Sequence, residues 1–197
     1  MLELVLIIFF SYLVGSISFG IISGKLLNGI DIRKHGSGNA GVTNVLRILG
    51  KGPAIAVLFG DTLKGAVGVL IGLYFGDVIY GMAGGMAVVV GHIYPLYFGF
   101  KGGKGSATGF GVMLMLAPDV ISIGALIFVL TIITTRYVSL GSILGAIISV
   151  VMVFILHKPL PIQIFLLLMA SFVIFQHRSN ILRLYQGKEN KISLGSK

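Results

Sequence analysis

The chain has 197 residues, of which 56% are hydrophobic and only 11% charged, and its formal net charge is +9. A soluble domain carries about 25% charged residues, so this composition excludes an ordinary soluble fold. It predicts instead a single polytopic membrane domain over residues 1–197. The absence of cysteine excludes a disulfide framework and any cysteine-based metal or thioester site. Nucleic-acid binding is disfavoured, because the sequence has no basic soluble module to carry it.

Apolar segments with the character of membrane helices follow one another along the whole chain. We expect spans at residues 4–23, 53–75, 78–98, 109–117, 120–134, 139–156 and 160–176. The fourth is too short to cross a bilayer alone unless its helix begins inside the preceding glycine-rich loop, near Gly103. The predicted fold is therefore an all-α integral membrane protein, a bundle of seven transmembrane helices of which some are short.

Lysine and arginine are distributed unequally between the loops of this arrangement. On one side Lys158 is accompanied by the acidic residues Glu3, Asp77 and Asp119. The other side holds Lys25, Arg33, Lys34, Arg47, Lys51, Lys101, Lys104, Arg136, Arg178, Arg183, Lys188, Lys191 and Lys197. Cytoplasmic loops are the ones enriched in basic residues. We therefore expect the N-terminus outside and the C-terminus in the cytoplasm.

Two charged residues interrupt the second span. Asp61 and Lys64 are three positions apart, which places them on one face of a helix. Charges at this depth are costly and normally pair or face a protein interior. We expect a buried ion pair that fixes helix packing, and a role in a functional site is the alternative.

The first of three polar segments on the predicted cytoplasmic side reads GSGNAGVTNVLR, at residues 36–47. Its glycines match G-x-G-x-x-G, but a segment between membrane spans cannot belong to the βαβ unit that binds dinucleotides. Glycines still allow backbone N–H groups to approach an oxyanion. The side-chain donors beside them are Ser37, Asn39, Thr43 and Asn44. In a helix, Thr43 and Arg47 would point the same way, so we predict an anion-binding loop, with a plain glycine-rich turn as the alternative.

The second polar segment combines GHIYP, at residues 91–95, with FKGGKGSAT, at residues 100–108. Lys101 and Lys104 stand among glycines at a predicted helix N-terminus, where charge and helix dipole together attract an anion. The segment is not a Walker A loop, because a glycine follows Lys104 in place of Ser or Thr. The lysines could instead serve only membrane topology, but topology requires no glycines. We expect His92, near a helix end, to be structural.

The third polar segment, HRSNILRL at residues 177–184, closes the last span. If it is helical, His177 and Asn180 share a face, and His177 could act as a donor or as a general acid–base group. The alternative is an interfacial basic helix that binds anionic lipid headgroups. Two other anion-binding loops on the same membrane face favour the site. Ser142, in the turn after Arg136, is a further candidate, although hydroxyls in turns usually cap helices.

These segments offer many cations and donors but few groups that could accept a proton. The carboxylates on the predicted cytoplasmic side are Asp31 and Glu189, and neither stands beside a histidine. The four histidines and six acidic residues show no metal-ligand spacing, so no metal site is predicted. Such a site suits a substrate with an activated leaving group whose developing charge must be stabilised.

Together the three segments resemble the acyl-phosphate-dependent glycerol-3-phosphate acyltransferases, the PlsY family of bacterial membrane proteins. The resemblance rests on GSGNAGVTNVLR (36–47), GHIYPLYFGFKGGKGSAT (91–108) and HRSNILRLYQGKE (177–189), and it extends to the chain length and the seven spans. Val42 departs from the alanine more frequent in the family, a small apolar change. The resemblance implies transfer of a fatty acyl group from acyl phosphate to the 1-hydroxyl of glycerol 3-phosphate. The products would be lysophosphatidic acid and inorganic phosphate, in phospholipid biosynthesis.

The resemblance also implies site residues, partners and location. The implied catalytic residues are Lys104, Arg47, His177 and Asn180. The implied substrate-binding residues, with the candidate Ser142 added, are Ser37, Gly38, Asn39, Thr43, Gly102, Gly103 and Ser142. The partners would be acyl phosphate, glycerol 3-phosphate and membrane lipid, and no cofactor is implied. The site would face the cytoplasm from the bacterial inner membrane. A monomer is compatible with the sequence, and the oligomeric state stays open.

Two functions of other classes compete with this prediction. An anion transporter would gather a phosphorylated solute, but transporter sites usually lie near the membrane midplane between helices related by an internal repeat. The sequence shows no convincing repeat, and its candidate residues lie at one membrane face. A purely structural scaffold would leave unexplained why lysines stand among glycines at residues 100–108.

Overall fold

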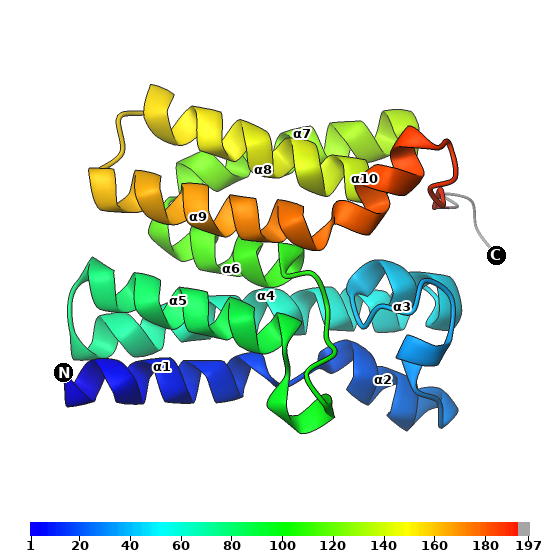
Figure 1. The fold of residues 1–197 in the computed structure, drawn as a ribbon, viewed down its shortest axis with the longest axis horizontal. Helices are drawn as coiled ribbons and strands as arrows, with labels where there is room; N and C mark the ends of the chain where they lie inside the picture. Colours follow the sequence, from blue (N-terminus) through cyan, green and yellow to red (C-terminus); the bar gives the residue numbers. More distant parts are fainter. Residues whose placement is uncertain (193–197) are drawn as a thin grey trace. The chain divides into compact units, whose positions relative to one another are not determined.

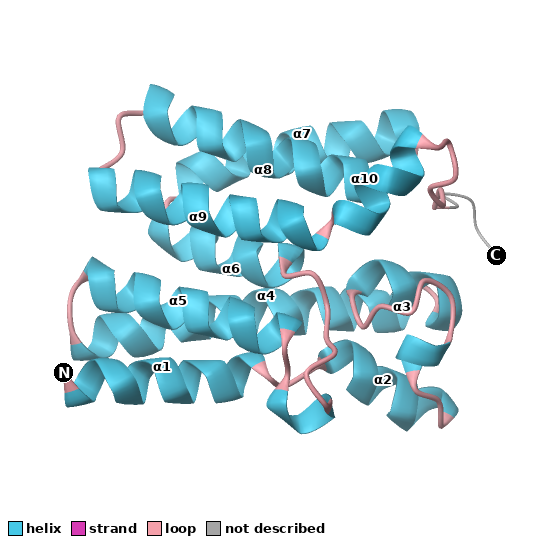
Figure 2. Cartoon of the chain, in the orientation of Figure 1, coloured by secondary structure: helices cyan, strands magenta, loops and turns pink. Residues whose placement is uncertain are grey.

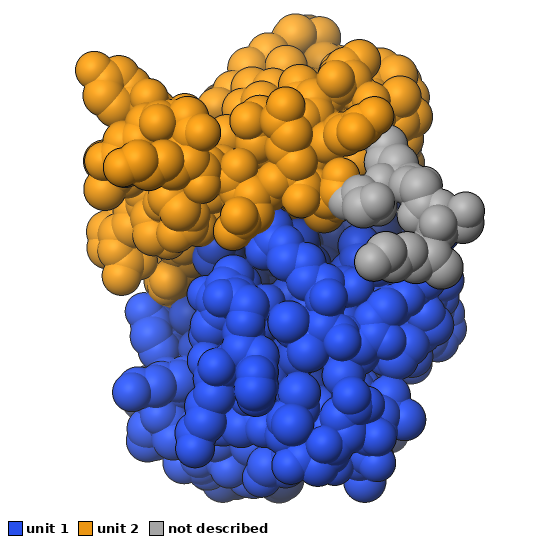
Figure 3. All heavy atoms as spheres, turned by 90° about the vertical axis from the view of Figure 1, so that its right-hand side faces the viewer, with its two compact units in different colours: residues 1–116 blue, residues 117–197 orange. Residues whose placement is uncertain are grey.

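The computed structural model describes residues 1–192, and all regular elements in that range are helical (Figures 1 and 2). The chain divides into two compact units, residues Met1–Leu116 and Ala117–Lys197, which Figure 3 colours separately. The first unit contains α1 (Leu2–Gly15), α2 (Phe19–Asn28), η1 (Ile32–Lys34), α3 (Val42–Leu49), α4 (Lys51–Phe75), α5 (Val78–Ile93), η2 (Leu96–Phe98) and α6 (Ser106–Leu116). The second contains α7 (Pro118–Thr135), α8 (Val138–Ile155), α9 (Leu160–Gln176) and α10 (Arg178–Tyr185).

The first predicted span is broken into two helices. α1 ends at Gly15 and α2 begins at Phe19, and the intervening Ser18 has an extended backbone, with φ −96° and ψ 96°. The hydroxyl of Ser16 donates to the carbonyl of Tyr12 at 2.9 Å and also accepts the N–H of Leu96 at 3.2 Å. These polar contacts stabilise the break and attach it to the loop that follows α5.

Glycines allow the helices of the first unit to approach to backbone contact. A side chain at Gly111 of α6 would collide with the carbonyl of Thr62 in α4, and one at Gly65 would collide with the carbonyl of Thr108. α4 and α6 therefore touch through two glycines, one on each helix. This close packing is typical of membrane helices, which lack a hydrophobic driving force for association and rely on van der Waals contact.

A small apolar core lies beneath the first polar segment. Its buried residues come from α2, η1, α3 and α4 and from the loop between η1 and α3: Ile21, Ile32, Ala40, Val45, Ala54 and Val57. The periodicity of α3 places Val45 in this core while Arg47 remains half-buried. The core thereby fixes both the start of α3 and the loop that leads into it.

The second unit is an arrangement of α7, α8 and α9 with a short terminal helix. α7 and α8 meet at Gly124, where a side chain would collide with the hydroxyl of Ser149. At the turn before α9, Lys158 pairs with Asp119 at 2.7 Å. α9 begins and ends where the sequence predicted, at Leu160 and Gln176, and α10 leaves it at an angle of 58°.

Five helical stretches of the described chain are long and apolar enough to cross a membrane, and the bent pair of α9 and α10 makes a sixth. The fourth predicted span does not pass this test, because α6 begins at Ser106 and has only 11 residues. Such a helix is about 16 Å long, against a hydrocarbon core of about 30 Å. Seven spans, the orientation of the termini and a single membrane domain over residues 1–197 stay predictions.

The α4–α6 contact predicts a sharp difference between two glycines. Gly111→Ala should destabilise the protein by about 1–3 kcal/mol, because the new methyl group meets the Thr62 backbone and the helices must separate. Gly52→Ala is the matched control, since a side chain there meets nothing within 4 Å. Thermal unfolding in detergent measures both. Equal melting temperatures for the two variants would contradict the packing described.

Candidate functional site

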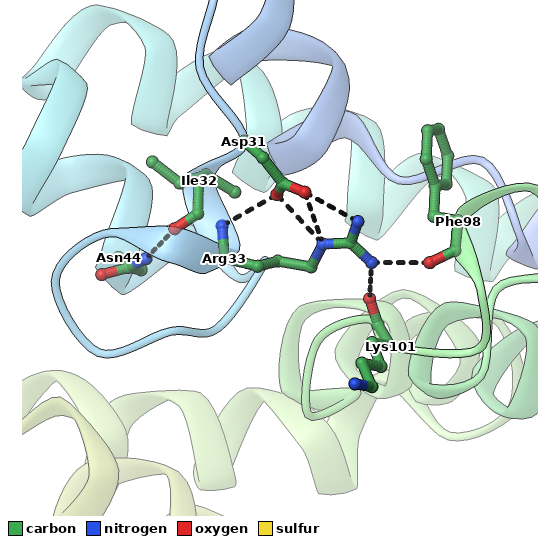
Figure 4. Close-up of polar contacts among 6 residues, drawn as sticks. All are labelled: Asp31, Ile32, Arg33, Asn44, Phe98 and Lys101. Carbon is green, nitrogen blue, oxygen red and sulfur yellow. Dashed lines mark hydrogen bonds and ion pairs between the residues drawn. The ribbon is translucent and has the colours of Figure 1, made fainter.

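The first polar segment is organised around one buried amide, the side chain of Asn44 on α3. Its Nδ2 donates to the carbonyls of Ile32, His35 and Asn39, at 3.0, 3.0 and 2.9 Å, and its Oδ1 accepts the N–H of Ser37 at 2.8 Å. Figure 4 shows the contact with Ile32. The expectation that Asn44 would offer a donor to an anion is therefore wrong, because its amide holds the loop together.

The backbone N–H groups of this segment are also used within it. Ser37 donates to Asn44, Gly38 donates to the carbonyl of His35 at 3.1 Å, and Gly41 donates to Oδ1 of Asn39 at 2.9 Å. Gly38 has a φ of +73°, which favours glycine. The predicted cradle of backbone donors is therefore not formed by these three amides. The glycines serve the shape of the loop, and the exposed side chain of Ser37 stays the candidate.

Thr43 and Arg47 lie on α3, as the sequence predicted. The helix spans Val42–Leu49, so the two side chains are one turn apart on the same face. Both are half-buried. α3 therefore presents a hydroxyl and a guanidinium together.

Arg33, in η1 just before the first polar segment, joins that part of the chain to the loop that contains Lys101 (Figure 4). Its Nη1 donates to the carbonyls of Phe98 and Lys101, at 2.6 and 3.0 Å. Its Nε and Nη2 donate to the carboxylate of Asp31, at 3.0 and 2.8 Å. The hydrogen bonds from this guanidinium lower the pKa of Asp31 to about 2. A fully ionised carboxylate thus aims the guanidinium at two backbone carbonyls that lie 65 and 68 positions away in the sequence.

The glycine–lysine loop, residues 99–105, is held at Gly102 and Gly103 by hydrogen bonds to the end of α5 and to Asn39. Gly102 and Gly103 donate to the carbonyls of Ile93 and His92 at the end of α5, each at 3.1 Å. The carbonyl of Gly102 accepts Nδ2 of Asn39 at 3.3 Å. The amides of Gly102 and Gly103, predicted to bind substrate, are thus committed to the fold. Lys104 follows directly as the half-buried cation of the loop.

A cavity of about 470 Å³ opens between these two segments. Three cations and one carboxylate line it, so its surroundings carry a net positive charge. Its lining residues are Asp31, Arg33, Lys34, Gly38, Phe98, Gly99, Lys101 and Gly102. Of the residues named from the sequence as anion-binding candidates, Gly38, Lys101 and Gly102 reach it. The sequence predicted the charge of Lys101 but missed Arg33 and its contacts with the carbonyls of Phe98 and Lys101. The only signal for Arg33 was its place among basic residues after α2.

The second unit contains a polar cluster centred on Glu189. This carboxylate, 5% exposed, accepts hydrogen bonds from Nδ2 of Asn180 at 2.6 Å, Nε of Arg183 at 2.7 Å and the hydroxyl of Ser139 at 2.9 Å. Burial alone would raise the pKa of Glu189, but these donors outweigh it and lower the pKa below its ordinary value. Asn180, a predicted catalytic residue, is thereby fixed by a carboxylate that the sequence had marked only as a cytoplasmic acid.

His177 lies at the junction of α9 and α10 and is 4% exposed. Its Nδ1 is 2.8 Å from the carbonyl of Val173, which can only accept, so the proton sits on Nδ1. In the neutral ring Nε2 then carries the lone pair. His177 and Asn180 are both buried at the start of α10, in agreement with a shared face. Ser142 is half-buried on α8, one turn after Ser139.

The predicted site residues divide between the two units. The first unit holds the residues of the first two segments: Ser37, Gly38, Asn39, Thr43, Arg47, Gly102, Gly103 and Lys104. The second holds Ser142, His177 and Asn180. In the first unit Asn39 donates to the carbonyl of Gly102, and Thr43 shares α3 with Arg47. That the predicted residues form one site stays a prediction.

The model of the family described as glycerol-3-phosphate acyltransferase matches residues 5–187. The chain belongs to this family. A glycerol-3-phosphate acyltransferase of Halalkalibacterium halodurans is 43% identical over 194 residues, covering 95% of this chain and 94% of the relative. One from Thermoanaerobacter sp. strain X514 is 47% identical over 182 residues, covering 92% of both chains. This acyltransferase chain therefore matches its relatives over nearly their whole length.

Two solved structures are similar to this acyltransferase. One is a crystal structure of PlsY (YgiH), an integral membrane glycerol 3-phosphate acyltransferase, in its glycerol 3-phosphate form. It has a TM-score of 0.91 and 39% identity, and the match covers 96% of both chains. The other is PlsY in its lysophosphatidic acid form, with a TM-score of 0.88 and 38% identity over 96% of this chain and 95% of that one. The likeness makes this chain an integral membrane protein of the same fold.

The contacts of Arg33 with Asp31, Phe98 and Lys101 predict how the glycine–lysine loop responds when the guanidinium is replaced. Arg33→Lys keeps the charge but cannot bind a carboxylate and two carbonyls at once. Charge-assisted hydrogen bonds contribute about 1.5–3 kcal/mol each, so amide exchange at Gly102 and Gly103 should accelerate about 10-fold or more. Arg178→Lys is the control, because that side chain is exposed and donates to the carbonyl of Phe175, three residues away, at 3.3 Å. Unchanged amide exchange at Gly102 and Gly103 in Arg33→Lys would show that the loop does not depend on the contacts of Arg33.

Proposed function

We propose that this acyltransferase moves a fatty acyl group from acyl phosphate to the 1-hydroxyl of glycerol 3-phosphate. The products are 1-acyl-glycerol 3-phosphate, which is lysophosphatidic acid, and inorganic phosphate. The observation that carries the proposal is the pair of basic loops joined by Arg33 around a positively charged cavity, in a membrane fold. Both proposed substrates bear phosphate, one is a lipid and one is water-soluble, which suits cationic loops at a membrane face. The solved relatives in glycerol 3-phosphate and lysophosphatidic acid forms support the acceptor and the product.

The choice of acyl phosphate as donor rests on the chemistry of the loops. An acyl phosphate is a mixed anhydride and needs no activation. The 1-hydroxyl oxygen attacks the acyl carbonyl, the bond between that carbon and the phosphate oxygen breaks, and phosphate leaves with the electron pair. We assign the hydroxyl proton to a substrate phosphate, because the basic loops offer cations and donors, and Asp31, the carboxylate among them, is paired with Arg33. Cations stabilise the oxyanion that forms on the way.

The residues take distinct parts in this reaction. Lys104 and Arg47 stabilise the developing negative charge, and Thr43, one turn before Arg47, contributes a hydroxyl on the same face. Ser37 offers its exposed hydroxyl to phosphate. Asn39 and the glycines Gly38, Gly102 and Gly103 act by shaping the two loops around the anion.

His177, Asn180 and Ser142 are the residues that we assign to orienting the acceptor. His177 uses Nε2, since Nδ1 is turned to Val173. Asn180 is held in place by Glu189. Ser142 adds a hydroxyl from α8. These roles make His177 an orienting group for glycerol 3-phosphate and not the base.

We also infer the topology in which the site works. Seven spans, with α6 the short one, place the basic loops on the cytoplasmic side of the bacterial inner membrane, with the N-terminus outside. The distribution of lysine and arginine supports this orientation. Glycerol 3-phosphate then arrives from the cytoplasm, and the acyl phosphate arrives from the lipid.

The proposal is tested with purified protein in detergent or lipid, offered acyl phosphate and glycerol 3-phosphate. We expect lysophosphatidic acid and phosphate in equal amounts, and no product when acyl-coenzyme A replaces the acyl phosphate. Product only from acyl-coenzyme A would correct the donor. No product from either donor would overturn the enzymatic proposal and leave anion transport as the competing function.

His177→Ala tests the orienting role. We expect KM for glycerol 3-phosphate to rise by more than kcat falls, because a group that only orients the acceptor contributes binding shared by ground state and transition state. The pH profile of kcat should keep its shape. A loss confined to kcat, together with one missing ionisation in the pH profile, would instead identify His177 as the general base.

A further inference from the structure

The first unit contains a buried polar cluster outside the loops described so far. Lys64 and Asp61 of α4 pair at 2.9 Å, with side chains 3% and 2% exposed. Nδ1 of His92, on α5, lies 3.4 Å from the same Asp61 oxygen, and its side chain is 5% exposed. The proposed reaction uses none of these three groups. Their burial in a membrane protein nevertheless requires a reason, because such groups are costly at this depth.

The opposite edge of the His92 ring faces the glycine–lysine loop. A side chain at Gly103 would collide with Nε2 of His92, so the imidazole abuts the loop backbone directly. The backbone of His92 adds a second contact, since its carbonyl accepts the N–H of Gly103 at 3.1 Å. Gly102 packs equally closely, because a side chain there would collide with the same carbonyl. His92 thus supports the loop with both its ring and its backbone.

The ring of His92 has a fixed orientation because its two edges have different neighbours. Asp61 lies at the Nδ1 edge, and Gly103 lies at the Nε2 edge. Lys64 holds Asp61 in turn and also donates to the carbonyl of Ile17 at 2.6 Å. A continuous series of contacts therefore runs from the break between α1 and α2, through the ion pair and the imidazole, to the residue before Lys104.

We propose that His92 is a positioning residue of the transfer reaction, which sets Lys104 through the backbone of Gly103 while Asp61 holds the imidazole. This assignment rests on the proposed function, in which Lys104 stabilises the oxyanion. The ring touches no substrate and acts only through the loop. Its loss displaces Lys104 without removing it. A displacement of about 1 Å in a catalytic group can cost up to about 100-fold in rate.

Two substitutions distinguish the contribution of the Nδ1 edge of the ring from that of the Nε2 edge. In His92→Asn the side-chain amide can occupy the place of Nδ1 beside Asp61, but nothing reaches Gly103. In His92→Gln the longer side chain carries its amide to the place of Nε2. We expect kcat/KM for acyl phosphate to fall about 10-fold or more in His92→Asn and to recover most of this loss in His92→Gln. If His92 mattered only for stability, the longer side chain of His92→Gln would not restore kcat/KM relative to His92→Asn.

A double-mutant cycle with Lys104→Ala shows whether His92 acts through that lysine. If it does, His92→Asn should lower kcat/KM by less than about 2-fold when Lys104 is already absent, because coupled residues are not additive. Equal losses in both backgrounds would overturn the assignment.

Amide exchange gives an independent measurement, and His92→Asn should accelerate exchange at Gly103 and Lys104. Unchanged exchange there would also overturn it.

Ser149→Ala serves as the control for general destabilisation. Ser149 is 1% exposed on α8 in the other unit, where its hydroxyl donates to the carbonyl of Gly145 at 2.8 Å. We expect this variant to change the melting temperature and to leave kcat/KM near that of the wild type. The wild type in the same preparation must form lysophosphatidic acid. If it forms none, the proposed function fails, and the exchange measurement alone decides whether His92 positions the loop.

Discussion

The buried ion pair of Lys64 and Asp61 is the interaction on which the first unit depends. A lone charge inside a membrane helix is costly, and one that is paired and hydrogen-bonded is tolerated. Lys64 meets this condition by donating to Ile17 as well as to Asp61. The break at Ser16–Ser18 interrupts the regular pattern of helical hydrogen bonds, and a membrane interior offers no water to the carbonyls concerned. The ammonium thus finds a second acceptor at the broken helix, and the carbonyl of Ile17 finds a donor there.

In the polar loops, hydrogen bonds of the backbone fix the loop conformation, and side chains are the groups that we assign to anion binding. Asn44, Arg33 and the carbonyls at the end of α5 hydrogen-bond several backbone groups of the loops. The side chains that we assign to the anion therefore stand on loops that are partly fixed by their own hydrogen bonds. A site built in this way loses little conformational entropy on binding, because its loops are ordered beforehand. The arrangement differs from a phosphate-binding loop in which backbone N–H groups themselves hold the ligand.

Local patterns in the sequence predicted the features that arise from local causes. The apolar run from Leu160 to Gln176 gave α9 its bounds, and helical spacing predicted both the α3 face of Thr43 and the pairing of Asp61 with Lys64. The break in the first span escaped, since hydropathy is high on both sides of it and the lysine that stabilises it is 47 positions away. The structural roles of Asn44 and Glu189 were not predicted from the sequence, for a similar reason. Each is a polar residue whose partners only folding assembles, and nothing in its own sequence neighbourhood distinguishes a framework amide from a ligand amide.

The shortness of α6 has a consequence for how the protein meets its lipid. α4 has 25 residues and is about 38 Å long, more than twice the length of α6. In the proposed topology, a short helix that ends at the outer side begins well below the cytoplasmic surface, and the bilayer must thin or admit water around its first turn. In the proposed topology, such thinning brings the interface, where the lipid carbonyls lie, toward Lys104, two residues before α6. Hydrophobic mismatch would thus let a lipid present its reactive carbonyl without leaving the membrane, while the polar partner enters from the water.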